Sequence, residues 1–98
     1  MSDIKDFVIE NGELKQYKGA AAVVAIPYGV TSIGKDAFYG CDNLANVICL
    51  SQEPPILEKE VFPYPNATTL QVPRGSLERY KASDWNKYFE GRIVEIEE

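Results

Sequence analysis

The sequence predicts a small α+β fold, a short leucine-rich-repeat β-solenoid of about three turns that opens with a β-hairpin and closes with helices. Three observations support this prediction. Apolar residues recur every 23 positions, an Asn-Gly pair separates two alternating runs near the amino end, and aromatic residues gather near the carboxyl end. A period in the twenties is typical of leucine-rich repeats, whose turns each hold a strand and a short helix or arc.

The repeat rests on positions that alternate with small or polar neighbours, the period-2 pattern of a strand with one buried face. One such turn cannot bury its apolar side alone, so successive strands are expected to pair edge to edge. The last strand departs from the pattern and is expected to bury either Ile93 alone or Val94 with Ile96. The equivalent positions are Val24, Val47, Leu70 and Ile93, followed by Ile26, Cys49, Val72 and Glu95.

Residues 7–17 are predicted to form the amino-terminal hairpin. Asn11-Gly12 lies between the alternating runs 7–10 and 13–17. This pair favours a type I′ turn, because both central residues of that turn need positive φ. The hairpin would cover the open edge of the first turn, since exposed strand edges promote aggregation.

Residues 23–72 are predicted to hold the repeat turns. The first strand, 23–26, would end before Pro27, which lacks a backbone donor. Residues 34–39 are expected to form a short helical segment that ends at Gly40.

The interior of these turns is predicted from the same spacing. Phe38 would fill the inside of the first turn, near the level of Val61 and Phe62 in the next. Ile33 and Ile56 would be equivalent inward positions. Residues 58–62 are expected to form another helical turn.

Residues 73–98 are predicted to close the fold with two short helices and a last strand. Ser76 is placed to cap the first helix, and Ser83 or Asp84 to cap the second. The aromatic residues available to close the far end of the core are Tyr80, Trp85, Tyr88 and Phe89.

Residues 24–47 resemble the consensus of the BspA-like leucine-rich repeat family. In that consensus a strand ends in Ile-Pro, a Gly-Val-Thr-x-Ile-Gly arc follows, and Ala-Phe-x-Gly-Cys precedes a leucine and the next strand. Here these are Ile26-Pro27, residues 29–34, residues 37–41 and Leu44. The later part, from residue 54, resembles the family's C-terminal end-piece. The resemblance thus covers roughly residues 7–96 and implies a short member of a bacterial family.

The resemblance implies a non-catalytic module for protein–protein interaction or cell-surface adhesion, because BspA-like proteins are associated with attachment and host-protein binding. The alternative is a structural scaffold, or a self-associating minimal repeat domain, without a dedicated ligand. The expected partner is therefore a host protein or a second copy, and the expected state is a monomer or weak dimer.

Candidate contact residues are the tyrosines in the predicted turns: Tyr28, Tyr39 and Tyr64. Tyrosine suits recognition surfaces because it offers a large contact area and loses little side-chain freedom. The alternative is that at least two of them pack across neighbouring turns.

Composition excludes several other classes. The net charge is −5 and the chain has no basic run, which argues against nucleic acid as a partner. The longest apolar run, 20–26, is far too short to cross a membrane. The absence of histidine removes His-dependent catalysis and, with no phosphate-binding glycine loop, argues against an enzyme or a cofactor.

Cys41 and Cys49 are expected to be free core thiols. A disulfide or metal pair is the alternative, but a zinc site needs four ligands and the chain has no histidine. No metal site is therefore expected.

The length fits one domain, residues 1–98. The amino end lacks the layout of a signal peptide. The compartment therefore stays open between the cytoplasm and, if a signal was removed, the cell surface or the secreted fraction.

Overall fold

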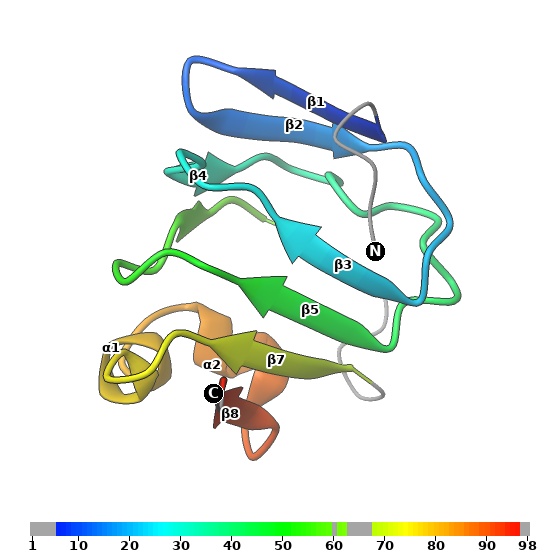
Figure 1. The fold of residues 1–98 in the computed structure, drawn as a ribbon. Coiled ribbons are helices and arrows are strands. Elements are labelled where there is room, and N and C mark those ends of the chain that lie inside the picture. Colours follow the sequence, from blue (N-terminus) through cyan, green and yellow to red (C-terminus); the bar gives the residue numbers. More distant parts are fainter. Residues whose placement is uncertain (1–5, 60, 63–67, 97–98) are drawn as a thin grey trace.

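The computed structural model describes residues 6–59, 61–62 and 68–96. Within these ranges the chain forms two four-stranded sheets and two short helices, an α+β fold (Figure 1). Sheet A holds, in spatial order, β1 (Phe7–Glu10), β2 (Glu13–Tyr17), β4 (Ser32–Ile33) and β6 (Ile56–Leu57). Sheet B holds β3 (Val23–Ile26), β5 (Asn46–Cys49), β7 (Thr69–Val72) and β8 (Ile93–Glu95). The helices are α1 (Leu77–Lys81) and α2 (Trp85–Phe89).

The predicted amino-terminal hairpin is confirmed. Strands β1 and β2 pair antiparallel around Asn11 and Gly12, whose φ angles are 52° and 82°. The hairpin also joins the rest of sheet A, because β2 runs parallel to β4. The carbonyl oxygen of Gly12 accepts a 2.7 Å hydrogen bond from the Thr31 amide, so the turn itself is docked on the chain that leads into β4.

The predicted register of sheet B is also confirmed. Val24 lies beside Val47, Val47 beside Leu70, and Leu70 beside Ile93, all in parallel pairs. These four side chains point into the core. In β8 the predicted alternative in which Ile93 is the inward residue holds, since Ile93 is buried and Val94 is 44% exposed.

The predicted leucine-rich-repeat solenoid is wrong. A solenoid stacks equivalent turns along one axis, whereas the described residues form two sheets closed by two helices, with extents of 29 × 28 × 28 Å. The 23-residue spacing holds within sheet B, but the segments between its strands differ. Sheet A begins with an antiparallel hairpin, and both helices lie between β7 and β8. Equal spacing therefore sets strand register here without requiring equivalent turns.

Two local predictions fail for identifiable reasons. Residues 34–39 form turns in place of a helical segment, because Asp36 has a φ of 59° and a left-handed residue interrupts a right-handed helix. Ile56 is 72% exposed, because β4 aligns Ile33 with Leu57. A shift of one residue turns a strand's side chains to the opposite face. The predicted turn at 58–62 includes Glu60, which lies outside the described residues.

Phe38 fills the core as predicted, with no exposed surface. It belongs to a series of aromatic contacts that runs through the core. Its ring centroid lies 5.7 Å from that of Tyr17 and 5.1 Å from that of Phe62, and Phe62 lies 5.6 Å from Trp85. The series connects the hairpin at one end of the molecule with α2 at the other.

Both predicted helices are present, but of the predicted caps only Ser83 accepts a hydrogen bond from a helix amide. Ser76 occupies the N-cap position of α1, yet its hydroxyl donates to the Pro73 carbonyl oxygen at 2.6 Å. At α2 the Ser83 hydroxyl accepts a 3.2 Å hydrogen bond from the Trp85 amide, while Asp84 makes no capping bond. In the described part of the chain, neither five-residue helix has the length and apolar character that a bilayer crossing requires.

Candidate functional site

One face of sheet B is left uncovered by the part of the chain that the structure describes. In Figure 1 no helix lies in front of β3, β5 and β7, and α2 lies behind the sheet, on the side of the core. Alternate side chains of these strands point outward and are half-buried or exposed. We call this surface the outer face. It consists of Val23, Ala25, Asn46, Ile48, Thr69, Gln71 and Val94, with Pro27, Leu50, Pro73 and Ile96 directly after the strands.

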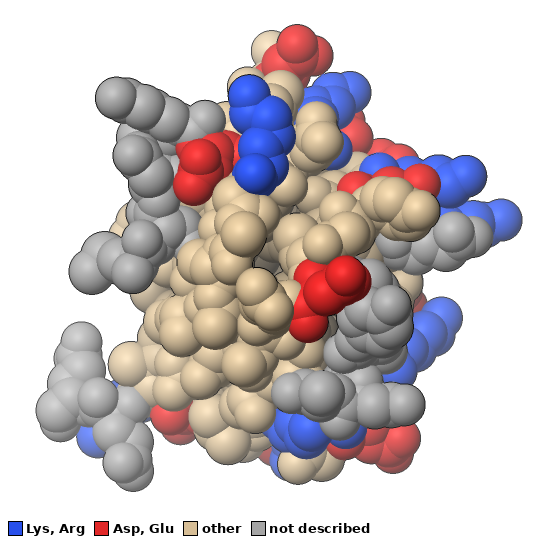
Figure 2. Space-filling model, turned by 90° about the vertical axis from the view of Figure 1, so that its right-hand side faces the viewer, with Lys and Arg blue, Asp and Glu red and all other residues tan. Residues whose placement is uncertain are grey.

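The outer face carries no charged residue, although about a quarter of the chain is charged. When one face of a sheet packs on the core, the opposite, solvated face normally carries polar and charged side chains. Here most outward residues are apolar, and Val23 and Val94 are 40% and 44% exposed. Figure 2 shows a further broad uncharged area on the adjoining side of the molecule, where these strands begin.

A groove lies where the strands of sheet B end. Parallel strands bring their carboxyl ends to one edge, and two open depressions of about 270 and 780 Å³ adjoin there. They share Arg74 and Ile96. We call them together the carboxyl-end groove. The smaller is also lined by Tyr28, Leu50, Gln52 and Pro73, and the larger by Gln71, Leu77, Ile93, Val94 and Glu95.

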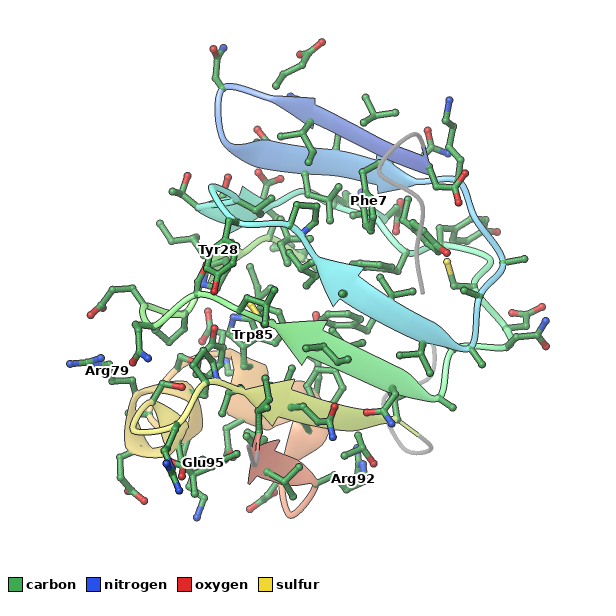
Figure 3. The ribbon with its side chains drawn as sticks, viewed as in Figure 1. Phe7, Tyr28, Arg79, Trp85, Arg92 and Glu95 are labelled. Atoms are coloured by element: carbon green, nitrogen blue, oxygen red, sulfur yellow. The ribbon has the colours of Figure 1, made fainter. Side chains whose placement is uncertain are left out.

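Tyr28 stands at one side of this groove with 76% of its surface exposed. It follows Pro27, which ends β3, and precedes Gly29 at a φ of 89°, so a tight turn presents its ring. In Figure 3 Tyr28 and Glu95 lie toward the end where the strands finish, and Arg92 lies at the other end of β8.

Two charged residues line the groove, and they differ in their partners. The Oε2 atom of Glu95 accepts a 3.0 Å hydrogen bond from the Gly75 amide. The carbonyl oxygen of Arg74 accepts a 3.3 Å bond from Gln52, but the Arg74 guanidinium has no ion-pair or hydrogen-bond partner among the residues described. Of these two charged groups, the Arg74 guanidinium is thus the one without a partner among the residues described.

The structure separates the predicted contact tyrosines. Tyr39 is 79% exposed, but it lines a different depression with Lys15 and Lys35. Tyr64 lies outside the described residues. Because Tyr28 and Tyr39 both project into solvent, the alternative that at least two of the three tyrosines pack across neighbouring turns is wrong.

Most of the outer face was missed by sequence reasoning. The signal was nevertheless present, because the 23-residue spacing also places Ala25 beside Ile48, and Gln71 beside Val94. Within the strands these outward positions are uncharged, and Arg92, directly before β8, borders them.

The two cysteines are free and buried, as predicted. Burial raises the pKa of the Cys49 thiol, and hydrogen bonds from Tyr80 and Ser51 oppose this effect. Burial and the nearby Asp42 carboxylate raise the pKa of Cys41. Thiols with a raised pKa stay protonated near neutral pH, which makes them poor nucleophiles.

Within residues 6–59, 61–62 and 68–96, no group of three or more His, Cys, Asp or Glu side chains is placed to hold a metal ion. What the described arrangement offers chemically is a surface for recognition. No protein-family model matches the chain, and no curated protein is detectably similar to it.

Proposed function

We propose that this protein is a non-catalytic protein-interaction module that binds its partner through the outer face and the carboxyl-end groove. The observation that carries the proposal is a continuous uncharged sheet face, open to solvent, with the exposed ring of Tyr28 beside it. Open surfaces of this kind mark interaction sites. The centres of protein interfaces are likewise depleted in charge and enriched in tyrosine.

The surface is suited to binding because its backbone is already ordered. Strands β5 and β7 are each paired on both sides, so their outward residues keep their places when a partner arrives. A preordered surface loses little conformational entropy on association. Tyr28 adds a large ring with few rotatable bonds, the kind of residue that often contributes most to an interface.

The resemblance of residues 24–47 to BspA-like repeats supports an adhesive role, in which the partner is a host protein at the cell surface. This part of the proposal depends on the resemblance, since a fold does not by itself determine a function.

Site-specific photo-crosslinking tests the proposal. A benzophenone amino acid replaces Tyr28 in the full chain, and Tyr39 is replaced in the matched control because it is equally exposed and lies outside the proposed surface. We expect a discrete protein adduct from position 28 and none from position 39. The same adducts from both positions, or none from position 28, would contradict the proposal.

The cross-linked protein is then purified and its affinity for the chain measured. Val94→Asp places a charge on the outer face, and Ile56→Asp places one on an exposed apolar residue of sheet A, outside the face. We expect Val94→Asp to weaken binding at least tenfold and Ile56→Asp to leave it within twofold. Equal affinities for the two variants would show that the outer face is not the contact surface.

A further inference from the structure

We infer that the carboxyl-end groove binds a short linear segment of the partner, and that Arg74 pairs with a carboxylate on that segment. This inference rests on the proposed function and specifies the chemistry of the partner. It is carried by two independent observations, the size of the surface and the charge within the groove.

The outer face is too small to hold a folded partner on its own. Four strands about 4.8 Å apart and three rows of outward residues about 6.6 Å apart give it dimensions of roughly 19 by 20 Å. Stable complexes bury about 800 Å² on each partner, about twice this area. A second copy that docked flat on this face would therefore be held weakly.

A short segment fits the groove better. The larger depression, of about 780 Å³, is open along one side, so it can take an extended segment that continues beyond it. Both depressions are bordered by Arg74 and Ile96, so a segment that fills them must pass the Arg74 side chain.

The unpaired guanidinium of Arg74 indicates which chemical group of the segment binds there. The Glu95 carboxylate is engaged by the Gly75 amide, while the Arg74 guanidinium is unpaired among the residues described. A guanidinium binds a carboxylate through two parallel hydrogen bonds. Glu95 also faces the larger depression, so a singly charged carboxylate is favoured over the more highly charged phosphate.

Apolar residues lie on both sides of Arg74. Leu50 and Pro73 line the smaller depression with Tyr28, and Leu77 and Val94 line the larger. The expected segment therefore carries an aspartate or glutamate with apolar or aromatic residues before and after it.

The test uses a phage-displayed library of random linear peptides, selected on the immobilised full chain. We expect enrichment of peptides in which an acidic residue is flanked by apolar ones. A synthetic enriched peptide should bind Arg74→Glu at least tenfold more weakly than the original chain. The same peptide with its acidic residue changed to lysine should regain affinity for Arg74→Glu.

Arg79→Glu is the matched control. Arg79 is also exposed, but it lies outside the groove and pairs with Glu53 at 3.6 Å. We expect this variant to bind the peptide within twofold of the original chain. Similar losses for Arg74→Glu and Arg79→Glu would show a general charge effect and overturn the role of Arg74.

Three other results would overturn the inference. They are a library that yields no enriched peptide, enriched peptides without an acidic residue, and a concentration-dependent dimer in sedimentation that Val94→Asp abolishes. The last would make a second copy the occupant of the face. If the inference fails while Val94→Asp still weakens binding of the cross-linked partner, the proposed interaction surface stands and only the inferred chemistry of its ligand is wrong.

Discussion

The indole nitrogen of Trp85 donates a 2.8 Å hydrogen bond to the carbonyl oxygen of Pro55, thirty residues earlier in the chain. Both residues are buried. The Tyr80 hydroxyl makes a second bond of this kind, to the Ser51 carbonyl oxygen at 2.7 Å. The two helices thus close the core by donating to two carbonyl groups of the connection between β5 and β6, of which the buried Pro55 carbonyl would otherwise lack this partner.

Trp85→Phe should lower the free energy of unfolding by about 1–3 kcal/mol, because it retains an aromatic ring but leaves the Pro55 oxygen without a donor. Urea unfolding measures this change. Circular dichroism monitors it, because Trp85 is the single tryptophan of the chain and the variant has no tryptophan fluorescence to follow. Tyr28→Phe, which removes an exposed hydroxyl, is the control and should unfold as the original chain does. An unchanged midpoint for Trp85→Phe would mean that the Pro55 bond contributes nothing to stability.

Phe38→Ala should cost roughly 3–5 kcal/mol, enough to unfold most of a domain this small. The ring is fully buried between Tyr17 and Phe62, so its removal leaves a cavity in the aromatic series. The neighbouring Tyr39→Ala should change stability by less than about 0.5 kcal/mol, because Tyr39 is exposed. If the thermal melts of Phe38→Ala and Tyr39→Ala coincided, Phe38 would not be a core residue that the fold depends on.

Stability should fall as the pH rises above about 9. The pKa values of Cys49 and Tyr80 are raised in the folded state, chiefly by burial, from ordinary values of 9.0 and 10.0. Above these values the unfolded chain loses protons that the folded chain keeps, so the unfolded state is favoured. Below pH 8 both groups are protonated in both states, and their contribution is fully present.

Each group can contribute up to about 1.4 kcal/mol per pH unit to this alkaline slope. Urea unfolding between pH 7 and 10.5 measures the slope. Cys49→Ala should flatten it by removing the thiol, even if the variant is less stable at pH 7. A slope of equal steepness in the variant would show that the Cys49 thiol does not titrate with unfolding.

Tyr28→Ser and Tyr39→Ser should each leave the melting temperature nearly unchanged, because both rings are exposed. Tyr17→Ser provides the contrast. Its ring is buried, with its centroid 5.0 Å from that of Phe7, and its loss should destabilise the fold by several kcal/mol. A large drop in melting temperature for Tyr28→Ser would place that residue among the structural ones and weaken its proposed role in binding.

Local signals predicted a good part of the fold. The Asn11-Gly12 pair located the hairpin because few residue pairs tolerate two positive φ angles in succession. The helical prediction at 34–39 failed because a left-handed residue at Asp36 has no strong signature in the sequence. Ile56 was misplaced because the chain between β5 and β6 is one residue longer than the repeat requires, which aligns Leu57 with Ile33.

The candidate site could be predicted less well. Tyr28 was identified as a candidate contact residue because it lies in a predicted turn, but the groove beside it depends on Arg74 and Ile96, which lie far along the chain. No local pattern shows that these residues meet. Their proximity follows from the parallel order of β3, β5, β7 and β8.

The 23-residue spacing specifies which side chains of β3, β5 and β7 face the core and which strands lie in register, because alternate residues of a strand point to opposite faces and equal spacing aligns them. That no other described segment covers the outward side chains follows from the packing of the whole fold and from no local pattern. A sheet face is open or buried according to where the remaining elements pack, and the hydrogen bonds of Trp85 and Tyr80 hold both helices at the end of the core, away from that face.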